Sequence, residues 1–219
     1  MFDLYTCATP NGYGVSITLE EMGLPFEVHT VDLSQLEHKQ PAFLKLNPNG
    51  RVPVLHDRET GITVWESAAI RLYLADKTGM LMPTDPERRW QATAWMMLQA
   101  TAVGPNQSQA NIFQRFFPEH LPSVISRFRN ETRRLYGVID GHLKEQPYLA
   151  GEYSIADCGL WPWVRLAHYG NIDLGDYPHV AEWFERVGAR PATLRGIVPD
   201  EQGATEQQKY AAAQKILMF

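Results

Sequence analysis

The pattern of apolar and polar positions divides the chain into two parts. In the first part, short apolar runs alternate with segments that repeat apolar residues at helical spacing, in the order β-α-β-α-β-β-α. The predicted strands are residues 2–6, 26–33, 52–56 and 62–65, and the predicted helices are residues 15–22, 41–46 and 67–77. A βαβ unit followed by a ββα unit indicates an α/β domain whose mixed sheet is covered by helices.

The second part is helical throughout. Asp85 followed by Pro86 is typical of a helix start, and apolar residues on one face from Ile125 to Leu143 indicate a helix in the core of a bundle. Further helices are expected from Ser154 and over residues 179–188. We therefore predict an α/β domain at 1–78, a linker at 79–87, an all-α helical-bundle domain at 88–200 and a tail at 201–219. The tail is expected to be either a docked helix or a frayed end.

Composition narrows the classes of function without naming one. Of the 219 residues, 44% are hydrophobic and 21% are charged, which is typical of a soluble folded protein. No apolar run approaches the length of a membrane span, and the N-terminus lacks the basic and apolar regions of a signal peptide. The net charge of -5 argues against a nucleic-acid surface. We therefore expect a cytoplasmic protein with no nucleic-acid or membrane partner.

The two cysteines, Cys7 and Cys158, form neither a CxxC pair nor a cluster with metal-ligand spacing. The histidines are scattered along the chain. We therefore predict reduced thiols and no metal site.

Three short stretches carry candidate chemistry, and the first is Val52-Pro53. A proline cannot donate to a strand ladder, so its place at the start of a predicted strand is unusual. A cis bond before Pro53 would turn the backbone of Val52 outward and free its N–H and C=O for a ligand. The plainer alternative is an edge strand that begins at Pro53.

The second stretch is Glu66-Ser67, where a strand gives way to a helix. A helix N-terminus offers free N–H groups and partial positive charge, which suit a carboxylate, and the Ser67 hydroxyl adds a donor. Glu66 could hold an ammonium group beside that carboxylate, so the pair matches an α-amino acid head group. An ordinary N-cap is the alternative.

The third stretch is the turn from Thr9 to Gly12, between the first strand and the first helix. Crevices at the carboxyl ends of strands are usual ligand positions in α/β sheets. The Thr9 hydroxyl and an Asn11 amide N–H could stabilise a thiolate at the helix N-terminus, although Pro, Asn and Gly also form plain turns.

A further motif near Ser154 is interpreted as structural. Ser154 and Asp157 have the spacing of a capping box, with Asp in place of Glu or Gln. Tyr153 and Cys158 flank it as a possible hydrophobic staple.

The order and spacing of these stretches resemble the glutathione S-transferases over residues 1–198. That family has a thioredoxin-like N-terminal domain with a cis-proline and an all-helical C-terminal domain, which is the fold that the resemblance implies here. Within the family, the chain resembles the bacterial Nu-class through Thr9-Pro10-Asn11-Gly12, Phe43-Leu44, Asn47-Pro48-Asn49, Glu66-Ser67, Trp161-Pro162-Trp163 and Arg190-Pro191-Ala192. The class implies a homodimer that uses glutathione as co-substrate and reduces disulfide bonds with little dependence on a protein cysteine.

The resemblance also implies roles for individual residues. The Val52 backbone, beside Pro53, would pair with the cysteinyl part of glutathione. Glu66 and Ser67 would hold the γ-glutamyl amino and carboxylate groups. The catalytic Thr9 and Asn11 would lie near the glutathione sulfur. Residues expected at the edges of the site are Gln40 and Arg51, for the glycyl carboxylate, and Gln109 and Arg134, from the second domain.

Members of this family differ in the group that activates the thiol. Tyr5 lies inside the first predicted strand, where packing is its expected role, and Ser16 lies past the first turn of its helix. Cys7 stands two residues before the slot that precedes the proline, and Thr9 holds that slot. We therefore favour a mechanism in which ionised glutathione is the nucleophile and attacks a disulfide. Conjugation of electrophiles, reduction of peroxides and a non-catalytic glutathione-binding module remain the alternatives.

Overall fold

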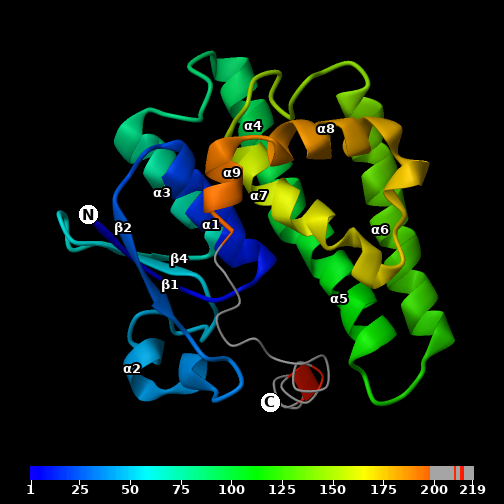
Figure 1. Cartoon of the computed structure of the whole chain (residues 1–219), viewed down its shortest axis with the longest axis horizontal. Coiled ribbons are helices and arrows are strands. Elements are labelled where there is room, and N and C mark those ends of the chain that lie inside the picture. The colour runs from blue at the N-terminus through cyan, green and yellow to red at the C-terminus, as the bar shows by residue number, and fades with distance from the viewer. Residues whose placement is uncertain (198–209, 211–212, 215–219) are drawn as a thin grey trace.

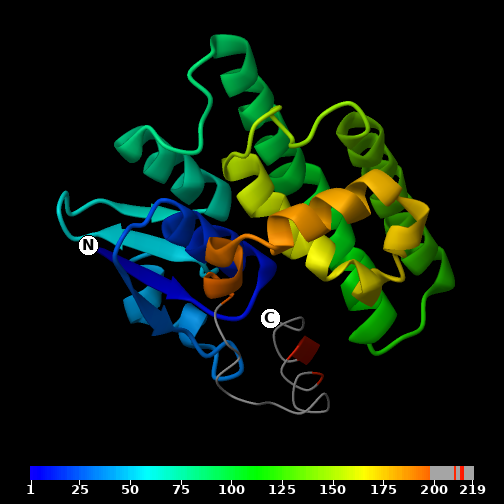
Figure 2. The same ribbon diagram turned by 45° about the horizontal axis from the view of Figure 1, so that its top comes forward.

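The computed structural model describes residues 1–197, 210, 213 and 214. Figures 1 and 2 show a small sheet with its covering helices on one side and a group of longer helices on the other. Of the predicted tail at 201–219, all but Tyr210, Ala213 and Gln214 lies outside the described residues.

Four strands form a mixed sheet in the order β2-β1-β3-β4. Their bounds are β1 Phe2–Thr6, β2 Phe26–Thr30, β3 Val54–Asp57 and β4 Thr63–Trp65. β1 and β2 are parallel, with Leu4 opposite Val28, whereas β1–β3 and β3–β4 are antiparallel. With α1 (Pro10–Glu21), α2 (Pro41–Leu44) and α3 (Ser67–Thr78), the predicted order β-α-β-α-β-β-α is confirmed.

Several predicted bounds shift for local reasons. β3 begins at Val54, because Pro53 has no N–H to donate to the ladder. The first helix begins earlier than predicted, at Pro10, because Thr9 acts as its N-cap and proline is well suited to the first helical position. β2 ends at Thr30, three residues before the predicted end.

The helical part follows a connection at 79–85. Its helices are α4 Pro86–Leu98, α5 Gly104–Arg115, α6 Pro122–Leu143, α7 Ile155–Arg165, α8 Pro178–Gly188 and α9 Pro191–Arg195. A π-helical turn, η2 (Gln99–Val103), joins α4 to α5. Short 3₁₀ turns lie at η1 Glu37–Lys39, η3 Ala167–Gly170 and η4 Leu174–Asp176. The starts at Pro86 and after Ser154 match the predictions, while η2, α5 and α9 were not predicted. The domain bounds at 78 and 88 stay predictions.

One hydrophobic core joins the two parts. It runs from Leu4 on β1 through Ile17 on α1 and Leu74 on α3 to Trp163 on α7 and Trp183 on α8. Eight consecutive residues of α1 are buried, and all of them are either apolar or small, so this helix is covered on all sides. α1 packs against α3, α7 and α9 and is therefore the central contact between the sheet and the bundle.

The predicted capping box at the start of α7 is present. The Ser154 hydroxyl accepts from the Ala156 N–H, and the Asp157 carboxylate accepts from the Ser154 N–H at 3.0 Å. Burial raises the pKa of Asp157 to about 6. Cys158 contacts Tyr153, with Sγ donating to the phenol oxygen at 3.4 Å, so the predicted pairing of these two side chains is also present.

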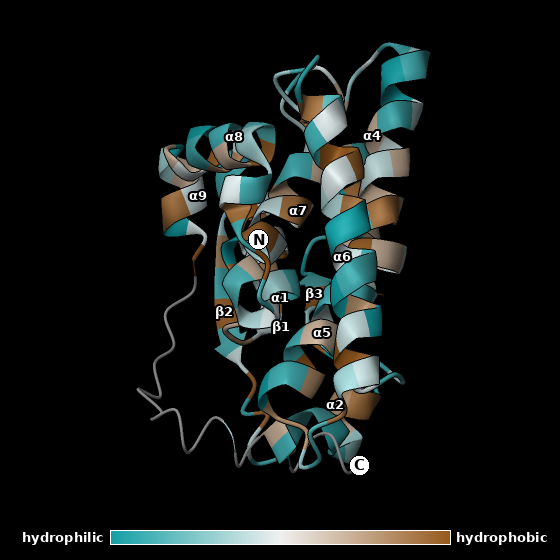
Figure 3. Ribbon diagram, turned by 90° about the vertical axis from the view of Figure 1, so that its right-hand side faces the viewer, coloured by the Kyte–Doolittle hydropathy of each residue, from teal (hydrophilic) through white to brown (hydrophobic). Residues whose placement is uncertain are grey.

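α6 forms an outer wall of the bundle. It buries a stripe that includes Ile125, Leu135 and Ile139 against α5 and α8, and Figure 3, which turns α6 toward the viewer, shows long hydrophilic stretches along it. Among the described residues, no helix combines the length and the apolar content needed to cross a membrane.

Candidate functional site

Strand register brings the three candidate stretches to one end of the sheet. At the carboxyl end of β1, Tyr5 pairs with Val54, the first residue of β3, and Val54 pairs with Trp65, the last residue of β4. The turn after β1, the residues before β3 and the residues after β4 must therefore lie at the same edge. Thr9, Val52 and Ser67 belong to these three segments, so the sequence predictions converge on one site.

The turn after β1 is organised by Thr9. Its backbone is extended, and its hydroxyl accepts from the Gly12 N–H at 3.2 Å, so Thr9 is the N-cap of α1. The same hydroxyl lies 3.4 Å from the Cys7 carbonyl, to which it donates. Pro10 has no N–H, and the Gly12 N–H donates to the Thr9 hydroxyl. The Asn11 backbone N–H is therefore the donor of the first turn that Thr9 does not cap. A Cβ at Gly12 would lie 2.3 Å from Thr6 Oγ1, so only glycine fits there.

The side chain of Asn11 is held from the helical part. The indole N–H of Trp163, on α7, donates to Asn11 Oδ1 at 3.2 Å. This bond crosses the seam between α1 and α7, and it orients an amide at the N-terminus of α1.

The peptide bond between Val52 and Pro53 is cis, as the sequence analysis considered. Val52 precedes the β1–β3 ladder, which begins at Val54, so the ladder does not use its backbone N–H and C=O. The loop before it is held by Asn47, whose side-chain amide donates to the Arg51 carbonyl at 2.7 Å and accepts from the Asn49 N–H. Asn47 is 1% exposed, so this loop is built on a buried polar side chain.

Glu66 has an unusual backbone at the junction of β4 and α3. Its φ is 69° and its ψ 118°, a combination that costs a non-glycine residue free energy, on the order of 1–3 kcal/mol. Its side chain is exposed and makes no cap bond; instead Asn49 Nδ2 donates to Glu66 Oε1 at 3.3 Å. Glu66 therefore occupies the N-cap position of α3 without capping the helix through its side chain. Strain held in this way is typical of functional sites.

Ser67 is the first residue of α3 and is 7% exposed. The side chain of Glu66, the N-cap residue, makes no cap bond to α3, and the first-turn N–H groups of a helix have no intrahelical partner. Together with the Ser67 hydroxyl they form an uncapped, partly positive helix end beside the Glu66 carboxylate. Such an end suits a carboxylate, and the neighbouring Glu66 suits an ammonium group.

Gln40 and Arg51 lie exposed on two segments that are tied together. The Lys39 ammonium donates to the Gly50 carbonyl at 3.1 Å, which joins the segment before α2 to the loop before Val52. The neighbouring His38 is buried, and burial, with the charges of Lys39 and Arg51, lowers its pKa. The two candidates for an anionic group are thus neighbours, and Lys39 adds a second cation to Arg51 on these segments.

The two candidates from the helical part are placed differently. Gln109 is half-buried on α5. Arg134 is exposed on α6 and makes two hydrogen bonds to Glu131, at 2.9 and 2.7 Å. In Figure 1, α6 lies on the side of the bundle away from the sheet. In this structure the Arg134 guanidinium is thus paired within its own helix.

Comparison with known sequence families gives a match over both parts of the chain. The description of one matching family model is glutathione S-transferase, N-terminal domain, over residues 9–77, and of the other glutathione S-transferase, C-terminal domain, over residues 122–186. The chain belongs to the glutathione S-transferase family. The resemblance seen in the sequence is thus confirmed.

Relatives of this glutathione S-transferase match it over most of their length. The disulfide-bond oxidoreductase YfcG of Escherichia coli (strain K12) is 37% identical, over 93% of this chain and 97% of that protein. A glutathione transferase from Pseudomonas putida, with one glutathione disulfide bound per subunit, is 37% identical with a TM-score of 0.85 over 90% of each chain. One from Burkholderia graminis, with two glutathione molecules bound per subunit, is 37% identical with a TM-score of 0.88, over 92% and 89%.

Other members of the family use a tyrosine or serine hydroxyl to activate glutathione, or a cysteine of the chain as the nucleophile. In this chain the corresponding side chains lie in other surroundings. Tyr5 stacks on His29, with ring centroids 4.7 Å apart, on the face of the sheet that α2 covers. The buried Ser16 hydroxyl donates to the Gly196 carbonyl. Cys158 is fully buried, and burial raises its pKa to about 12, so it is not a thiolate at neutral pH. Cys7 is half-buried at the end of β1.

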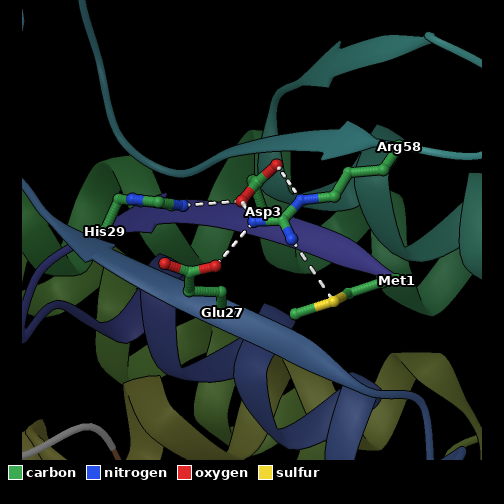
Figure 4. Close-up of polar contacts among 5 residues, drawn as sticks. All are labelled: Met1, Asp3, Glu27, His29 and Arg58. Carbon is green, nitrogen blue, oxygen red and sulfur yellow. Dashed lines mark hydrogen bonds and ion pairs between the residues drawn. The ribbon is translucent and has the colours of Figure 1, made fainter.

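A group of metal-type ligands was not foreseen from the sequence. Ligand atoms of Asp3, Glu27 and His29 lie within 4.8 Å of one another, because β1 and β2 pair in parallel register. Figure 4 shows Arg58 filling this group: it pairs with both carboxylates, while His29 lies 2.6 Å from Asp3. The hydrogen bond from Arg58 holds the pKa of Asp3 well below its usual range. The Arg58 guanidinium thus balances the charges of these two carboxylates.

Sequence reasoning missed two residues of the glutathione S-transferase site. Asn49 contacts Glu66 across the loop, and Trp163 contacts Asn11 across the seam. The Asn-Pro-Asn-Gly turn indicates only the bonds that Asn47 makes within its own turn, not the contact from Asn49 to Glu66. Nothing local in the sequence pairs Trp163 with Asn11, which is 152 residues away.

Proposed function

We propose that this protein is a glutathione-dependent disulfide-bond reductase of the Nu-class type, in which the bound glutathione thiolate is the nucleophile. The observation that carries the proposal is the meeting of Asn11 and Thr9 with Val52 and with Glu66-Ser67 at one end of the sheet. Along this edge the arrangement offers, one after another, hydrogen-bond donors for a sulfur, a free backbone edge for a peptide and a site for an amino acid head group. The names and bound ligands of the relatives support the same reaction.

Glutathione is proposed to bind across the three segments. Its γ-glutamyl carboxylate lies at the N-terminus of α3 against Ser67, and its amino group lies against Glu66. Its cysteinyl backbone pairs with Val52, beside Pro53. The glycyl carboxylate lies near Gln40 and Arg51, where Lys39 adds a second cation. Gln109 faces the site from α5, and a contact with Arg134 would require it to leave Glu131.

The reaction follows from where the sulfur lies. The Asn11 amide and the N-terminus of α1 favour the thiolate over the thiol by donating hydrogen bonds to it. The Thr9 hydroxyl adds a further donor when its hydrogen turns from the Cys7 carbonyl to the sulfur. The thiolate attacks one sulfur of the substrate disulfide, forms a mixed disulfide and releases the other sulfur as a thiolate that takes up a proton. A second glutathione thiolate attacks the glutathione sulfur of the mixed disulfide, which yields glutathione disulfide and the second substrate thiol.

The test is reduction of a small dialkyl disulfide by glutathione, followed by the appearance of glutathione disulfide. We expect Cys7→Ser to keep most of the wild-type kcat/KM and Asn11→Ala to lose about tenfold or more, the value of one hydrogen bond to a charged group. Complete loss of activity in Cys7→Ser would show that the chain supplies the nucleophile. Turnover of aryl halides without turnover of disulfides would instead favour a conjugating transferase.

The proposed assembly is a homodimer in the cytoplasm. Trp90 is 72% exposed, and with Ala94 and Met97 it forms an apolar stripe on one face of α4. A second copy of the chain is the proposed cover for this stripe. Light scattering should show a dimer for the wild type and a shift toward monomer for Trp90→Glu; a wild type that is monomeric at micromolar concentration would exclude it. A reducing compartment suits a reaction that consumes reduced glutathione.

A further inference from the structure

We propose that Trp163 is a positioning residue for the reaction: its indole N–H fixes the side-chain amide of Asn11 so that Nδ2 faces the glutathione sulfur. This inference rests on the proposed function, which places that sulfur beside Asn11. It adds a contribution from α7 to the part of the site around the sulfur, which is otherwise built from Thr9 and Asn11.

The identity of the two bonded atoms sets the orientation of the amide. An indole nitrogen can only donate, so the Asn11 atom that lies 3.2 Å from it is the carbonyl oxygen Oδ1. If the amide were flipped, two N–H donors would face each other. The Nδ2 group of Asn11 is therefore turned away from Trp163, with both of its hydrogens available to a partner elsewhere in the site.

The indole that makes this bond is itself held in place. Trp163 is 8% exposed, and a Cβ at Gly104, the first residue of α5, would lie 3.3 Å from its ring. Gln107 Nε2 donates to the Trp163 carbonyl at 2.6 Å, and the Tyr136 hydroxyl donates to Gln107 Oε1 at 3.0 Å. Both Gln107 and Tyr136 are fully buried. A hydrogen-bonded chain thus runs from α6 through α5 and α7 to Asn11.

The consequence is a fixed donor for a charge that develops on sulfur. Donation to the thiolate lowers the pKa of the bound thiol, and a donor that is already oriented needs no reorganisation. Without the indole N–H, the amide can rotate and present Oδ1, which disfavours the thiolate. We expect the pKa of bound glutathione to rise by about one unit, so that activity at pH values below that pKa falls about tenfold.

Other titratable groups on the elements packed around Asn11 stay unchanged in this test. They include Cys7 at the end of β1, Tyr13, Glu20 and Glu21 on α1, and Asp157, Cys158 and Arg165 on α7. The Arg165 guanidinium lies 5.7 Å from the centre of the Tyr13 ring. Because none of them is substituted, a shifted pH profile reports on the amide.

The experiment compares Trp163→Phe with Trp161→Phe. Both tryptophans lie on α7 and donate one indole N–H, but Trp161 donates to the Phe184 carbonyl at 2.9 Å in the core. The readouts are the pH dependence of thiolate absorbance for bound glutathione, and kcat and KM for disulfide reduction. We expect Trp163→Phe to raise the pKa and lower kcat with KM for glutathione nearly unchanged, while Trp161→Phe leaves both the pKa and the ratio of kcat to KM at wild-type values.

A double-mutant cycle with Asn11→Ala shows whether Trp163 acts through Asn11. If it does, Trp163→Phe has no further effect on the pKa once Asn11 is Ala. Gly104→Ala, which crowds the indole without removing it, is the second variant if Trp163→Phe does not fold, and it should shift the pKa in the same direction. Equal pH profiles for the variants and the wild type would overturn the inference while leaving the proposed function intact. A wild type that neither binds glutathione nor reduces disulfides would overturn both.

Discussion

Arg190 forms a bidentate ion pair with Glu21: Nε and Nη2 of the guanidinium lie 2.6 and 2.7 Å from the two carboxylate oxygens. The pair fastens the end of α8 to the last residue of α1, and the guanidinium also lies 3.8 Å from the centre of the Tyr153 ring. Lysine can supply the charge but neither the fork nor the flat stacking surface. We therefore predict that Arg190→Lys lowers the free energy of unfolding by about 1–3 kcal/mol, measured by urea denaturation.

The matched control for this prediction is Arg195→Lys. Arg195 pairs with Glu20 one residue earlier on α1, but its side chain is 58% exposed, against 34% for Arg190. An exposed pair contributes about 0–1 kcal/mol, so this variant should change little. Equal losses in the two variants would mean that burial and stacking add nothing to the Arg190 pair.

Because the backbone of Glu66 is strained, substitutions at this residue should affect the free energy of unfolding and the affinity for glutathione in different ways. Glu66→Gly removes strain of about 1–3 kcal/mol and adds the entropic cost of glycine, about 0.5–1 kcal/mol, so the variant should be at least as stable as the wild type. Glu66→Ala keeps the strain and should match the wild type in stability. Both variants lose the carboxylate, and calorimetry should show glutathione binding weakened about tenfold in each. A glycine variant that binds glutathione as tightly as the wild type would remove Glu66 from the binding site.

Arg71 is a buried cation without a carboxylate beside it. Its Nη2 donates to Gln99 Oε1 at 2.7 Å, while Nε and Nη1 have no hydrogen-bond partner among the described residues. Burial lowers its pKa to about 10, so it stays charged at neutral pH. Apolar replacement of buried charged groups often preserves or raises stability, by about 0–4 kcal/mol. We predict this outcome for Arg71→Met combined with Gln99→Met, measured by thermal unfolding.

Gln99→Met alone is the informative control for the buried cation. It removes the one hydrogen bond of the guanidinium and leaves the charge in place, so it should destabilise the protein by about 3 kcal/mol or more. A double variant that is less stable than this single variant would mean that the Arg71 charge itself stabilises the fold.

The ion group around Asp3 should make stability depend on pH. Because the folded-state pKa of Asp3 is lowered, its carboxylate stabilises the protein above the unfolded-state pKa of about 4 and loses that effect as pH falls below it. Asp3→Asn should therefore cost about 1–2 kcal/mol at pH 7, and the gap to the wild type should narrow below about pH 4. Urea denaturation at both pH values checks this. Glu27→Gln, on a side chain that is 51% exposed, should show a smaller gap, and a gap for Asp3→Asn that is constant with pH would contradict the assignment.

Most of the fold could be predicted from the sequence because its signals are local. Alternation of apolar residues marks β1, and Ser154 with Asp157 marks the start of α7 through bonds that span three residues. Val52 was proposed from the proline at the start of a predicted strand, and Ser67 from the start of a helix directly after a strand. The family resemblance joined the two, and the strand register that brings them to one edge came from the structure.

What the sequence could not supply depends on contacts between distant segments. The bond from Trp163 to Asn11 and the pair of Arg190 with Glu21 join the two ends of the chain, and no periodicity relates those positions. The group around Asp3 depends on the register of β1 and β2. The alternation of side chains does not fix this register, because a shift of two residues keeps the same side chains on the same face of the sheet. The positive φ of Glu66 is imposed by its surroundings, since an isolated glutamate avoids that conformation.

The π-helical turn at Gln99–Val103 makes the helix from Pro86 to Arg115 sensitive to the length of the chain. Such a turn holds one residue more than an α-helical turn, so deleting one residue within it would restore a regular helix at small local cost. Every side chain of α5 would then rotate by about 100° around the axis. Gln107 would leave the Trp163 carbonyl, and Gly104 would no longer make room for the indole. A deletion or insertion at this turn is thus a single genetic step that rotates α5, and with it the side chains that α5 presents to α7 and to the site, while the other elements keep their fold.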